Sequence, residues 1–300
     1  MKSGFVAVVG RPNVGKSTLV NQMVGTKVSI TSSRPQTTRN AIRGVVSGPD
    51  PNDPEYQIVL VDTPGLHRPR TELGHRLNAT VSGSLRDADM ALFVIDATMP
   101  IGPGDRLIAQ RLSDSKARVV TAVNKVDLAS RSDVISQLSK AGEWDFDEYF
   151  AVSAASGQGV PDLVAAIASR LDDGPMYFPS GTTTDQPEGF VIGEVIREKF
   201  LDRLRQELPH SLLVRVQEIE ERSVGVNVAA DVVVERASQK GIVIGSGAGV
   251  LRDAGTEARS ELERILGTKV HLDLRVVVEK DWQRRPQLLD RLGFKEGDHT

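Results

Sequence analysis

The sequence predicts an α/β domain built on a mostly parallel sheet with helices on both faces, followed by a smaller α+β domain. Short apolar runs alternate with helical patterns from residue 1 to about residue 170, which is typical of the first fold. Three of these runs, 5–9, 91–95 and 118–123, are almost unbroken, as expected of strands that are buried on both faces. The pattern changes after a segment rich in proline and glycine, which predicts the second domain.

The expected elements divide the chain into a first domain at residues 1–171, a linker at 172–189 and a second domain at 190–300. In the first domain the expected strands are 5–9, 41–47, 57–61, 91–95, 118–123 and 149–152, and the expected helices are 16–24, 71–84, 104–113, 131–140 and 160–170. Strand 41–47 can also pair antiparallel with 57–61, because the stretch between them is short enough for a hairpin. In the second domain the expected order is helix 190–207, strands 211–219 and 224–235, helices 239–245 and 250–266, and strand 269–279.

Composition narrows the class of protein. The 300 residues are 39% hydrophobic with a formal net charge of −3, so the domains can form cores and the whole chain is not a basic nucleic-acid binder. The absence of cysteine excludes disulfides, thiolate zinc sites and a cysteine nucleophile. We see no N-terminal signal and no apolar run of about 20 residues, so we expect a soluble, cytoplasmic protein.

The most specific motif is the glycine-rich loop G-x-x-x-x-G-K-S at residues 10–17, which stands between an apolar strand and a helical run. Glycines let backbone N–H groups turn around an anion, and the helix N-terminus adds its partial positive charge. Lys16 is expected to reach the β- and γ-phosphates and the Ser17 hydroxyl to hold Mg²⁺. The residues predicted to bind the nucleotide here are Gly10, Arg11, Pro12, Asn13, Val14, Gly15, Lys16, Ser17 and Thr18.

A second element, Asp62-Thr63-Pro64-Gly65, follows another apolar run and is also predicted to contact the nucleotide. A carboxylate at the end of a buried strand beside a phosphate loop can hold Mg²⁺ through a water molecule, and the Gly65 N–H can sense a γ-phosphate. An ordinary Asp/Pro/Gly turn is the alternative. Residues 66–77 after this element would form a second switch segment.

A polar run at residues 32–39 carries two threonines, Thr37 and Thr38. A threonine here can coordinate Mg²⁺ and contact the γ-phosphate, so that the segment is ordered only when the third phosphate is present. We favour Thr38. The predicted metal ligands are therefore Ser17, Thr38 and Asp62.

The element Asn124-Lys125-Val126-Asp127 identifies the base. Asp127 can accept hydrogen bonds from the N1–H and the exocyclic amine of guanine, whereas adenine lacks this pair of donors and would leave the carboxylate unpaired. Asn124 is expected to brace the base loop, and the Lys125 stem to cover one face of the base. Ser153-Ala154 ends the last expected strand of this domain, where a backbone N–H can donate to guanine O6.

The phosphate loop and the elements at 62–65, 124–127 and 153–154, in this order, resemble the set of the Ras-like GTP-binding proteins, which implies a P-loop GTPase domain that binds GTP and GDP. Ras-type enzymes place a water-orienting glutamine where this chain has Leu66. We therefore expect slow intrinsic hydrolysis of GTP, and the alternative is a nucleotide-binding module that does not turn GTP over. In related GTPases an asparagine at the position of Asn13 helps to hold K⁺, which replaces an arginine finger; local capping of the loop is the alternative. The residues assigned to catalysis are Lys16, Asn13, Thr38 and Gly65.

The second domain extends the resemblance over nearly the whole chain. The sequence closely resembles the Era family, bacterial GTPases with a C-terminal KH domain, in residues 34–39, 62–67, 235–245, 251–259, 267–270 and 272–274 and in Trp282. The resemblance implies a type II KH domain that binds single-stranded RNA near the 3′ end of 16S rRNA and assists assembly of the 30S ribosomal subunit. The GTP state would gate RNA binding and release, and DNA is not an expected partner.

KH domains hold the RNA backbone with a G-x-x-G loop between two helices. In this chain the second glycine of the family falls on Ala248 and the usual loop lysine falls on Ser246, so we expect a weakened clamp. The residues assigned to RNA by the resemblance are Lys240, Gly241, Gly245, Ser246, Gly247, Ala248, Arg252 and Lys269.

Charge gives the RNA interpretation no support, because residues 188–300 carry 18 Lys and Arg against 20 Asp and Glu. Trp282 is consistent with either stacking on RNA or packing in a core. The alternative function is therefore a GTPase switch whose degenerate KH domain contacts protein or membrane instead of RNA. A peripheral location on the inner face of the cell membrane belongs to this alternative.

Overall fold

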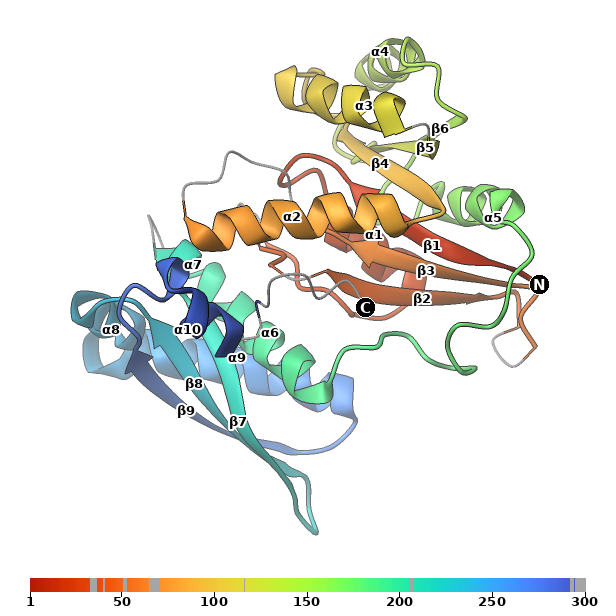
Figure 1. The fold of residues 1–300 in the computed structure, drawn as a ribbon. Coiled ribbons are helices and arrows are strands. Elements are labelled where there is room, and N and C mark those ends of the chain that lie inside the picture. The colour runs from red at the N-terminus through yellow and green to blue at the C-terminus, as the bar shows by residue number, and fades with distance from the viewer. Residues whose placement is uncertain are drawn as a thin grey trace.

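The structure is a computed structural model that describes residues 1–32, 37–39, 41–50, 53–64, 71–115, 117–204, 208–291 and 294. An α/β domain is followed by a smaller α+β domain (Figure 1), so the predicted fold class is confirmed. Gly65 and Leu66, to which the sequence assigns the γ-phosphate contact and the missing glutamine, lie outside the described residues.

The sheet of the first domain has the strand order β2-β3-β1-β4-β5-β6 within the described residues. All neighbouring pairs are parallel except β2 and β3, which form the antiparallel pair expected from their short connection. Every residue of β4 is buried, as its unbroken apolar sequence predicts. The strands are β1 (Lys2–Val9), β2 (Ile42–Gly48), β3 (Tyr56–Asp62), β4 (Met90–Asp96), β5 (Arg118–Asn124) and β6 (Glu148–Ala151).

Helices cover both faces of this sheet. Residues of α1 and α5 pack on one face, and residues of α2, α3 and α4 pack on the other. Because β1, β3 and β5 are parallel, the segments that follow them all lie at the same edge of the sheet, where ligands bind in open α/β folds. The helices are α1 (Lys16–Val24), α2 (Glu72–Asp87), α3 (Pro103–Ser115), α4 (Arg131–Gly142) and α5 (Val160–Arg170).

The second domain has the sheet order β7-β8-β9 in the described part of the chain, with β7 antiparallel and β9 parallel to β8. Residues of α6, α8 and α9 pack on one face of this sheet around the buried Val232. The elements are α6 (Glu188–Leu201), α7 (Leu208–Ser211), β7 (Leu213–Glu221), β8 (Val226–Val234), α8 (Ala237–Ile244), α9 (Gly249–Leu266), β9 (Val270–Val278) and α10 (Pro286–Arg291).

The other face of the second sheet packs against α2 of the first domain. Leu73 and Leu77 of α2 share one buried cluster with Leu213, Val233 and Trp282. The Trp282 side chain is fully buried, and its Nε1 donates a hydrogen bond to the Ser211 carbonyl oxygen at 3.0 Å. Trp282 is therefore a core residue between the two domains, and its use as an RNA stacking surface is excluded in this arrangement.

The segment between α5 and α6, residues 171–187, runs along the first domain. The buried Gln57 side chain accepts hydrogen bonds from the Tyr177 and Phe178 N–H groups at 2.8 and 2.9 Å and donates to the Phe178 carbonyl oxygen at 2.9 Å. Thr184 forms an isolated bridge with Gly44 at the outer strand β2. The segment predicted as a linker thus has fixed contacts along the sheet.

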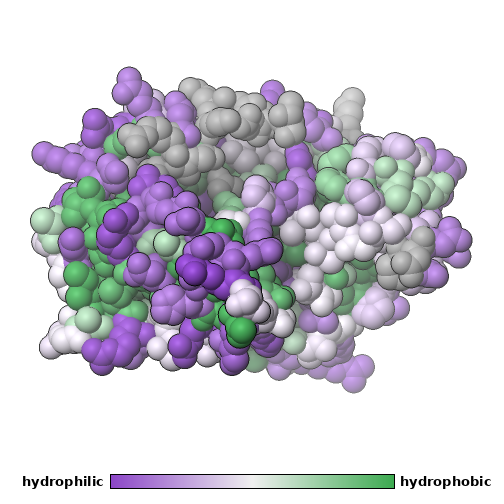
Figure 2. Space-filling model, turned by 90° about the horizontal axis from the view of Figure 1, so that it is seen from below, coloured by the Kyte–Doolittle hydropathy of each residue, from purple (hydrophilic) through white to green (hydrophobic). Residues whose placement is uncertain are grey.

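No helix within the described ranges is long and apolar enough to cross a bilayer. The face seen in Figure 2 shows hydrophobic patches broken up by hydrophilic side chains.

Candidate nucleotide-binding site

The phosphate loop joins β1 to α1 with the geometry that its sequence predicts. Gly15 stands at the helix N-cap with φ 97°, in the left-handed region. A Cβ atom at this position would lie 2.3 Å from Asn124 Nδ2, so that only glycine fits between the phosphate loop and the base loop. Ser17 and Thr18 lie in the first turn of the helix, where backbone N–H groups face outward toward an anion.

Lys16 is folded over the loop that precedes it. Its Nζ donates hydrogen bonds to the carbonyl oxygens of Gly10 and Arg11, both at 3.1 Å, and the residue is buried. Burial lowers the pKa of Lys16 to about 8, against the opposing effect of the nearby Asp62. The ammonium group therefore lies at the centre of the loop, where phosphate oxygens would compensate for its lost hydration.

Three oxygen-bearing side chains meet at the start of α1. Ser17 Oγ lies 2.9 Å from Thr38 Oγ1, and Thr38 Oγ1 lies 3.4 Å from Asp62 Oδ2. Of the two candidate threonines, it is Thr38 whose hydroxyl lies beside both Ser17 and Asp62. The predicted ligand set thus converges, although its members come from α1, a loop and the end of β3.

Asp62 is fully buried, and burial raises its pKa, while Lys16 and the hydroxyls of Ser17, Ser29 and Thr38 act in the opposite direction. Its Oδ2 is hydrogen-bonded, whereas its buried Oδ1 has no hydrogen-bond partner among the described residues. A buried carboxylate oxygen without a partner is costly unless a cation or a water faces it. This oxygen and the two hydroxyls are hard donors of the kind that Mg²⁺ prefers, so these residues fit the metal.

The base loop is braced by Asn124, as predicted. Its Nδ2 donates to the Val14 carbonyl oxygen at 2.9 Å, and its Oδ1 accepts from the Ala154 N–H at 2.9 Å. One buried side chain therefore ties the phosphate loop, the base loop and the segment after β6 together. Asp127, the predicted guanine-binding residue, is exposed on the same loop.

Lys125 makes contacts that the motif alone does not specify. It is in the left-handed region with φ 68°, and its Nζ binds the Asn13 carbonyl oxygen at 2.7 Å and Asp96 Oδ2 at 2.6 Å. Burial would raise the pKa of Asp96, but hydrogen bonds from Lys125 and Thr98 outweigh it, so this pKa lies below its usual value. The Lys125 ammonium group is thus held between the phosphate loop and Asp96, and the role of its stem in covering the base stays a prediction.

The segment Ser153-Ala154 lies beside the base loop, but its amides have partners within the chain. The Ser153 N–H donates to the Gln158 carbonyl oxygen at 2.9 Å, and the Ala154 N–H donates to Asn124. The hydrogen bond to guanine O6 stays a prediction.

The remaining predicted nucleotide residues are structural parts of the same loops. Thr63 Oγ1 donates to the Val8 carbonyl oxygen at 2.7 Å, which ties the end of β3 to β1 before Pro64. The Arg11 guanidinium is engaged by the buried Asp105 at 2.7 Å, so Arg11 presents its backbone to Lys16. Pro12 forms part of the loop turn, and Gly65 is outside the described residues.

Sequence reasoning missed Ser29 and Asn21, which shape the magnesium side of the site. Ser29 Oγ donates to Asp62 Oδ2 at 2.7 Å, and Asn21 Oδ1 accepts from the N–H groups of Val28 and Ser29, both at 2.9 Å. Neither residue belongs to a recognised motif. The only sequence feature that marks them is a polar residue beside apolar ones: Asn21 follows Val20, and Ser29 lies between Val28 and Ile30.

The predicted RNA loop lies between α8 and α9. Gly245 begins it with φ 75°, and Ala248 adopts φ 59° and ψ 26°, a left-handed conformation that is strained for any residue except glycine. Arg252 Nη2 donates to the Gly247 carbonyl oxygen at 2.7 Å, which folds this cation onto the loop. Lys240 and Gly241 lie on α8, and the exposed Lys269 lies 3.7 Å from Glu263.

A phosphate loop, a threonine and an aspartate beside its serine, and a braced Asn-Lys-x-Asp loop on a mostly parallel sheet define a P-loop GTPase. A model of the family described as 50S ribosome-binding GTPase matches residues 5–125, and a KH-domain model matches residues 207–283. Proteins described as GTPase Era from Mycobacterium avium (strain 104) and Mycobacterium tuberculosis (strain ATCC 25618 / H37Rv) are 49% and 50% identical over 300 residues. The first alignment covers 98% of this chain and 99% of the relative, and the second covers 97% and 98%.

Solved structures of Era match this chain over its whole fold. Aquifex aeolicus Era, as a variant bound to GDP·AlF₄⁻, matches with a TM-score of 0.92 and 36% identity over 98% of this chain and 100% of its own. Era in complex with MgGDPNP and nucleotides 1506–1542 of 16S ribosomal RNA gives the same TM-score and identity, over 98% and 99%. The chain belongs to the Era family of GTPases, and it is an enzyme that hydrolyses GTP.

Proposed function

We propose that this chain is a GTP-controlled RNA-binding protein that acts on the 3′ end of 16S rRNA during assembly of the 30S subunit. The observation that carries the proposal is the position of Thr38. The residues on either side of it, Thr37 and Arg39, are both bound by the KH domain. The Era complex with nucleotides 1506–1542 of 16S rRNA supports this RNA as the target.

The KH domain holds the first switch segment through two buried arginines. Arg197 of α6 donates a hydrogen bond to the Thr37 carbonyl oxygen, and Arg39 Nη1 donates to the Leu212 carbonyl oxygen at 2.8 Å. The Arg39 guanidinium also lies 5.7 Å from the centre of the Trp282 ring. A movement of Thr38 toward or away from a γ-phosphate would therefore displace the hydrogen bonds of its neighbours with α6 and with Leu212, which precedes β7.

The second switch segment reaches the KH domain as well. Arg76 of α2 forms an ion pair with Asp290 at 2.6 Å and donates to the Phe294 carbonyl oxygen. Leu73 and Leu77 lie in the buried cluster shared with Trp282. Because α2 begins shortly after the segment that contains Gly65, a change at the γ-phosphate is transmitted along a rigid helix to the same interface.

Mg²⁺ would be held by Ser17, Thr38 and Asp62, the three residues whose oxygen atoms converge in the structure. When bound, the ion neutralises charge on the β- and γ-phosphate oxygens. Lys16 would release the carbonyl oxygens of Gly10 and Arg11 and bind phosphate oxygens in their place. The Asn124 brace keeps the phosphate loop and the base loop at a fixed separation.

K⁺ is the second cation that we propose, held with the help of Asn13. This residue stands at the tip of the phosphate loop with φ 66°, and its carbonyl oxygen is fixed by Lys125. Its backbone is thus tied to the base loop, which supports a defined position for its side chain near the predicted phosphates. Such a cation would supply the charge that an arginine finger supplies elsewhere.

The alternative, in which the KH domain contacts protein or a membrane surface, is supported by the altered loop. Ser246 carries no cation and Ala248 is strained, so the loop is a poor phosphate clamp. We place the protein in the cytoplasm, with peripheral contact to the membrane as part of this alternative.

The test is fluorescence anisotropy with a labelled single-stranded RNA of the 16S 3′ end, added to protein loaded with a GTP analogue or with GDP. We expect binding that is about tenfold tighter in the GTP-analogue state, within the usual range of coupling. Anionic vesicles and an unrelated RNA of equal length serve as controls. Equal binding of both RNAs, or binding of vesicles only, would reject the proposal in favour of the alternative.

A further inference from the structure

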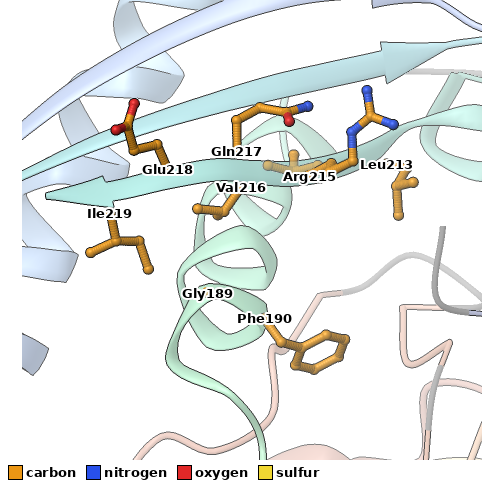
Figure 3. Close-up of a pocket in the computed structure, with 9 residues that line it drawn as sticks. Gly189, Phe190, Leu213, Arg215, Val216, Gln217, Glu218 and Ile219 are labelled. Carbon is orange, nitrogen blue, oxygen red and sulfur yellow. The ribbon is translucent and has the colours of Figure 1, made fainter. Parts of the chain in front are cut away.

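The edge of the KH-domain sheet carries a groove that the functions above do not use. Its volume is about 450 Å³, and it is lined by Gly189 and Phe190 at the start of α6 and by residues 213–219 of β7 (Figure 3). In the part of the chain that the structure describes, β7 pairs with β8 alone. Its outer side therefore presents backbone N–H and C=O groups that can pair with another extended chain.

The floor of the groove is apolar and open because one residue of α6 lacks a side chain. Val216 and Ile219 lie on the α6 side of β7, whereas Arg215 and Gln217 lie on the opposite side (Figure 3). A Cβ atom on Gly189 would lie 3.6 Å from Ile219 Cδ1 and 3.8 Å from the Val216 Cβ, in ordinary contact with both. A side chain larger than alanine at this position would therefore fill the groove, and an incoming side chain can occupy the same space.

The rim of the groove is acidic. Glu218 lines the groove, and Glu188 and Glu221 lie within two residues of lining residues in the sequence. All three are exposed, and none of them has an ion-pair partner among the described residues. Arg215 of this strand lies 3.0 Å from Asp231, which also pairs with Arg275 of β9, and the exposed Arg222, which follows the strand, lies 2.6 Å from Glu220. Glu188, Glu218, Glu220, Glu221 and Asp231 thus outnumber the three arginines, and the local charge is negative.

The negative charge at the rim favours one class of binding partner over the others. A second copy of the same strand would bring like charges together, and a nucleic acid would bring phosphates against carboxylates, so both are disfavoured. A basic segment gains favourable charge contacts at the rim while its alternate side chains enter the apolar floor.

We propose that the groove between α6 and β7 binds an extended, Lys- and Arg-rich segment of another protein, which adds a strand to the edge of β7. The site is separate from the nucleotide site and from the loop at residues 245–249. The groove therefore gives this chain a binding site for another protein in addition to the RNA-binding loop. This contact does not depend on how tightly the KH loop binds RNA.

The test uses the full chain and a fluorescein-labelled decapeptide of alternating lysine and valine, measured by anisotropy. We expect this peptide to bind at least about tenfold more tightly than the corresponding glutamate-valine peptide, with affinity that falls as salt rises. A third peptide, in which proline replaces every valine, keeps the positive charge but lacks half of the N–H groups that strand pairing needs. It should bind at least about tenfold more weakly.

Two matched variants test the groove itself. Gly189→Phe fills it and should weaken peptide binding at least about tenfold, whereas Gly189→Ala should leave it within about twofold. Both variants should hydrolyse GTP at the wild-type rate, which shows that they are folded. Charge reversal by Glu218→Lys with Glu221→Lys should weaken binding to a similar extent. Undiminished binding by Gly189→Phe, equal binding of the proline peptide, or displacement of the peptide by a single-stranded RNA would overturn the proposal.

Discussion

Arg197, a residue with no exposed surface in the KH domain, donates a hydrogen bond to the backbone carbonyl of Thr37 in the GTPase domain. The next residue, Thr38, has its hydroxyl 2.9 Å from Ser17 Oγ in the phosphate loop. Two consecutive residues thus make the contact with the KH domain and the contact with the nucleotide site. Glu198, the neighbour of Arg197 on α6, accepts a hydrogen bond from the Thr31 N–H at 2.8 Å, so α6 holds the switch segment on both sides.

Replacing Arg197 should uncouple the two domains. We expect Arg197→Ala to bring the ratio of RNA affinities in the GTP-analogue and GDP states from about ten to near one, because the mechanical link to Thr37 is lost. The affinity for GTP itself should change little, since Arg197 does not contact the nucleotide site. Anisotropy with labelled RNA measures the ratio. Arg203→Ala, which removes an arginine paired with Glu257 inside the KH domain, is the matched control and should keep the ratio.

Asp127 should determine the base. In Asp127→Asn, the amide cannot accept both hydrogen bonds of guanine, and we expect GTP affinity to fall by at least about 100-fold. Xanthosine triphosphate should bind the variant better than the wild type, because xanthine offers a carbonyl oxygen where guanine has its amine. Titration with fluorescent nucleotides measures both affinities. Asp133→Asn on the nearby α4 should change neither, and a loss of GTP affinity in that control equal to the loss in Asp127→Asn would contradict the assignment.

Potassium should accelerate hydrolysis through Asn13. We expect the rate of phosphate release to rise at least about tenfold when Na⁺ is replaced by K⁺ at constant ionic strength, because an added positive charge stabilises the transition state. Asn13→Ala should remove the rise while keeping the slow rate in Na⁺. Lys16→Ala serves as the inactive control. Equal rates of the wild-type protein in both salts would rule out this role.

Restoring the KH loop should strengthen RNA binding. Ala248→Gly removes a left-handed alanine that costs roughly 1–2 kcal/mol, partly offset by the greater chain entropy of glycine. Together with Ser246→Lys, it should tighten RNA binding and steepen the dependence of log K on log salt by about 0.7. The pair Ser246→Glu with Ala248→Gly provides the control of opposite charge. If the lysine and glutamate pairs bind RNA alike, the loop is not the clamp.

Asp231 should make the stability of the KH domain depend on pH. Burial raises its pKa, but hydrogen bonds from Arg215, Arg275 and Gln217 outweigh this effect and hold the pKa below its usual value. A group whose pKa is lower in the folded state stabilises the protein above its unfolded pKa of about 3.9, and this contribution is lost as pH falls. We expect Asp231→Asn to lower the free energy of unfolding by about 1–2 kcal/mol at pH 6, since Arg275 is largely exposed and solvent screens its pair with Asp231.

The difference between Asp231→Asn and the wild type should shrink as the pH falls below about 3.9. Urea unfolding at a series of pH values measures it. Asp273→Asn on the neighbouring strand is the control. A constant difference from pH 6 to pH 2.5 would contradict the role given to this carboxylate.

The elements of the GTPase domain and the main contacts of the phosphate loop follow from local sequence. Gly15, Lys16 and Ser17 are consecutive, so the strand before them and the helix after them fix their geometry. The same holds for Asn124, whose bracing contacts were predicted from its motif. In the KH domain most strands and helices were also predicted within a few residues. The exceptions are the short helices α7 and α10, which were not predicted, and the helix expected at 190–207, because α6 ends at Leu201.

Contacts between residues that are distant in the chain could not be predicted from the sequence. Examples are the contacts of Lys125 with Asp96, of Ser29 with Asp62 and of Arg197 with Thr37. In each pair, the local sequence around one residue does not indicate which distant residue it will contact. The segment predicted as a linker is a similar case. Its proline and glycine content correctly indicates the absence of regular structure, but only the fold shows that Gln57 binds it.

The central claim, that the nucleotide and the RNA act on one another through the contact between Arg197 and Thr37, is tested most directly by measuring both affinities reciprocally. The affinity for a GTP analogue relative to GDP is measured with and without saturating 16S 3′-end RNA, and the RNA affinity is measured in both nucleotide states. By linkage the two ratios must be equal, and we predict a value of about ten for the wild type and near one for Arg197→Ala. A ratio of one in the wild type, or an unchanged ratio of ten in Arg197→Ala, would contradict the account.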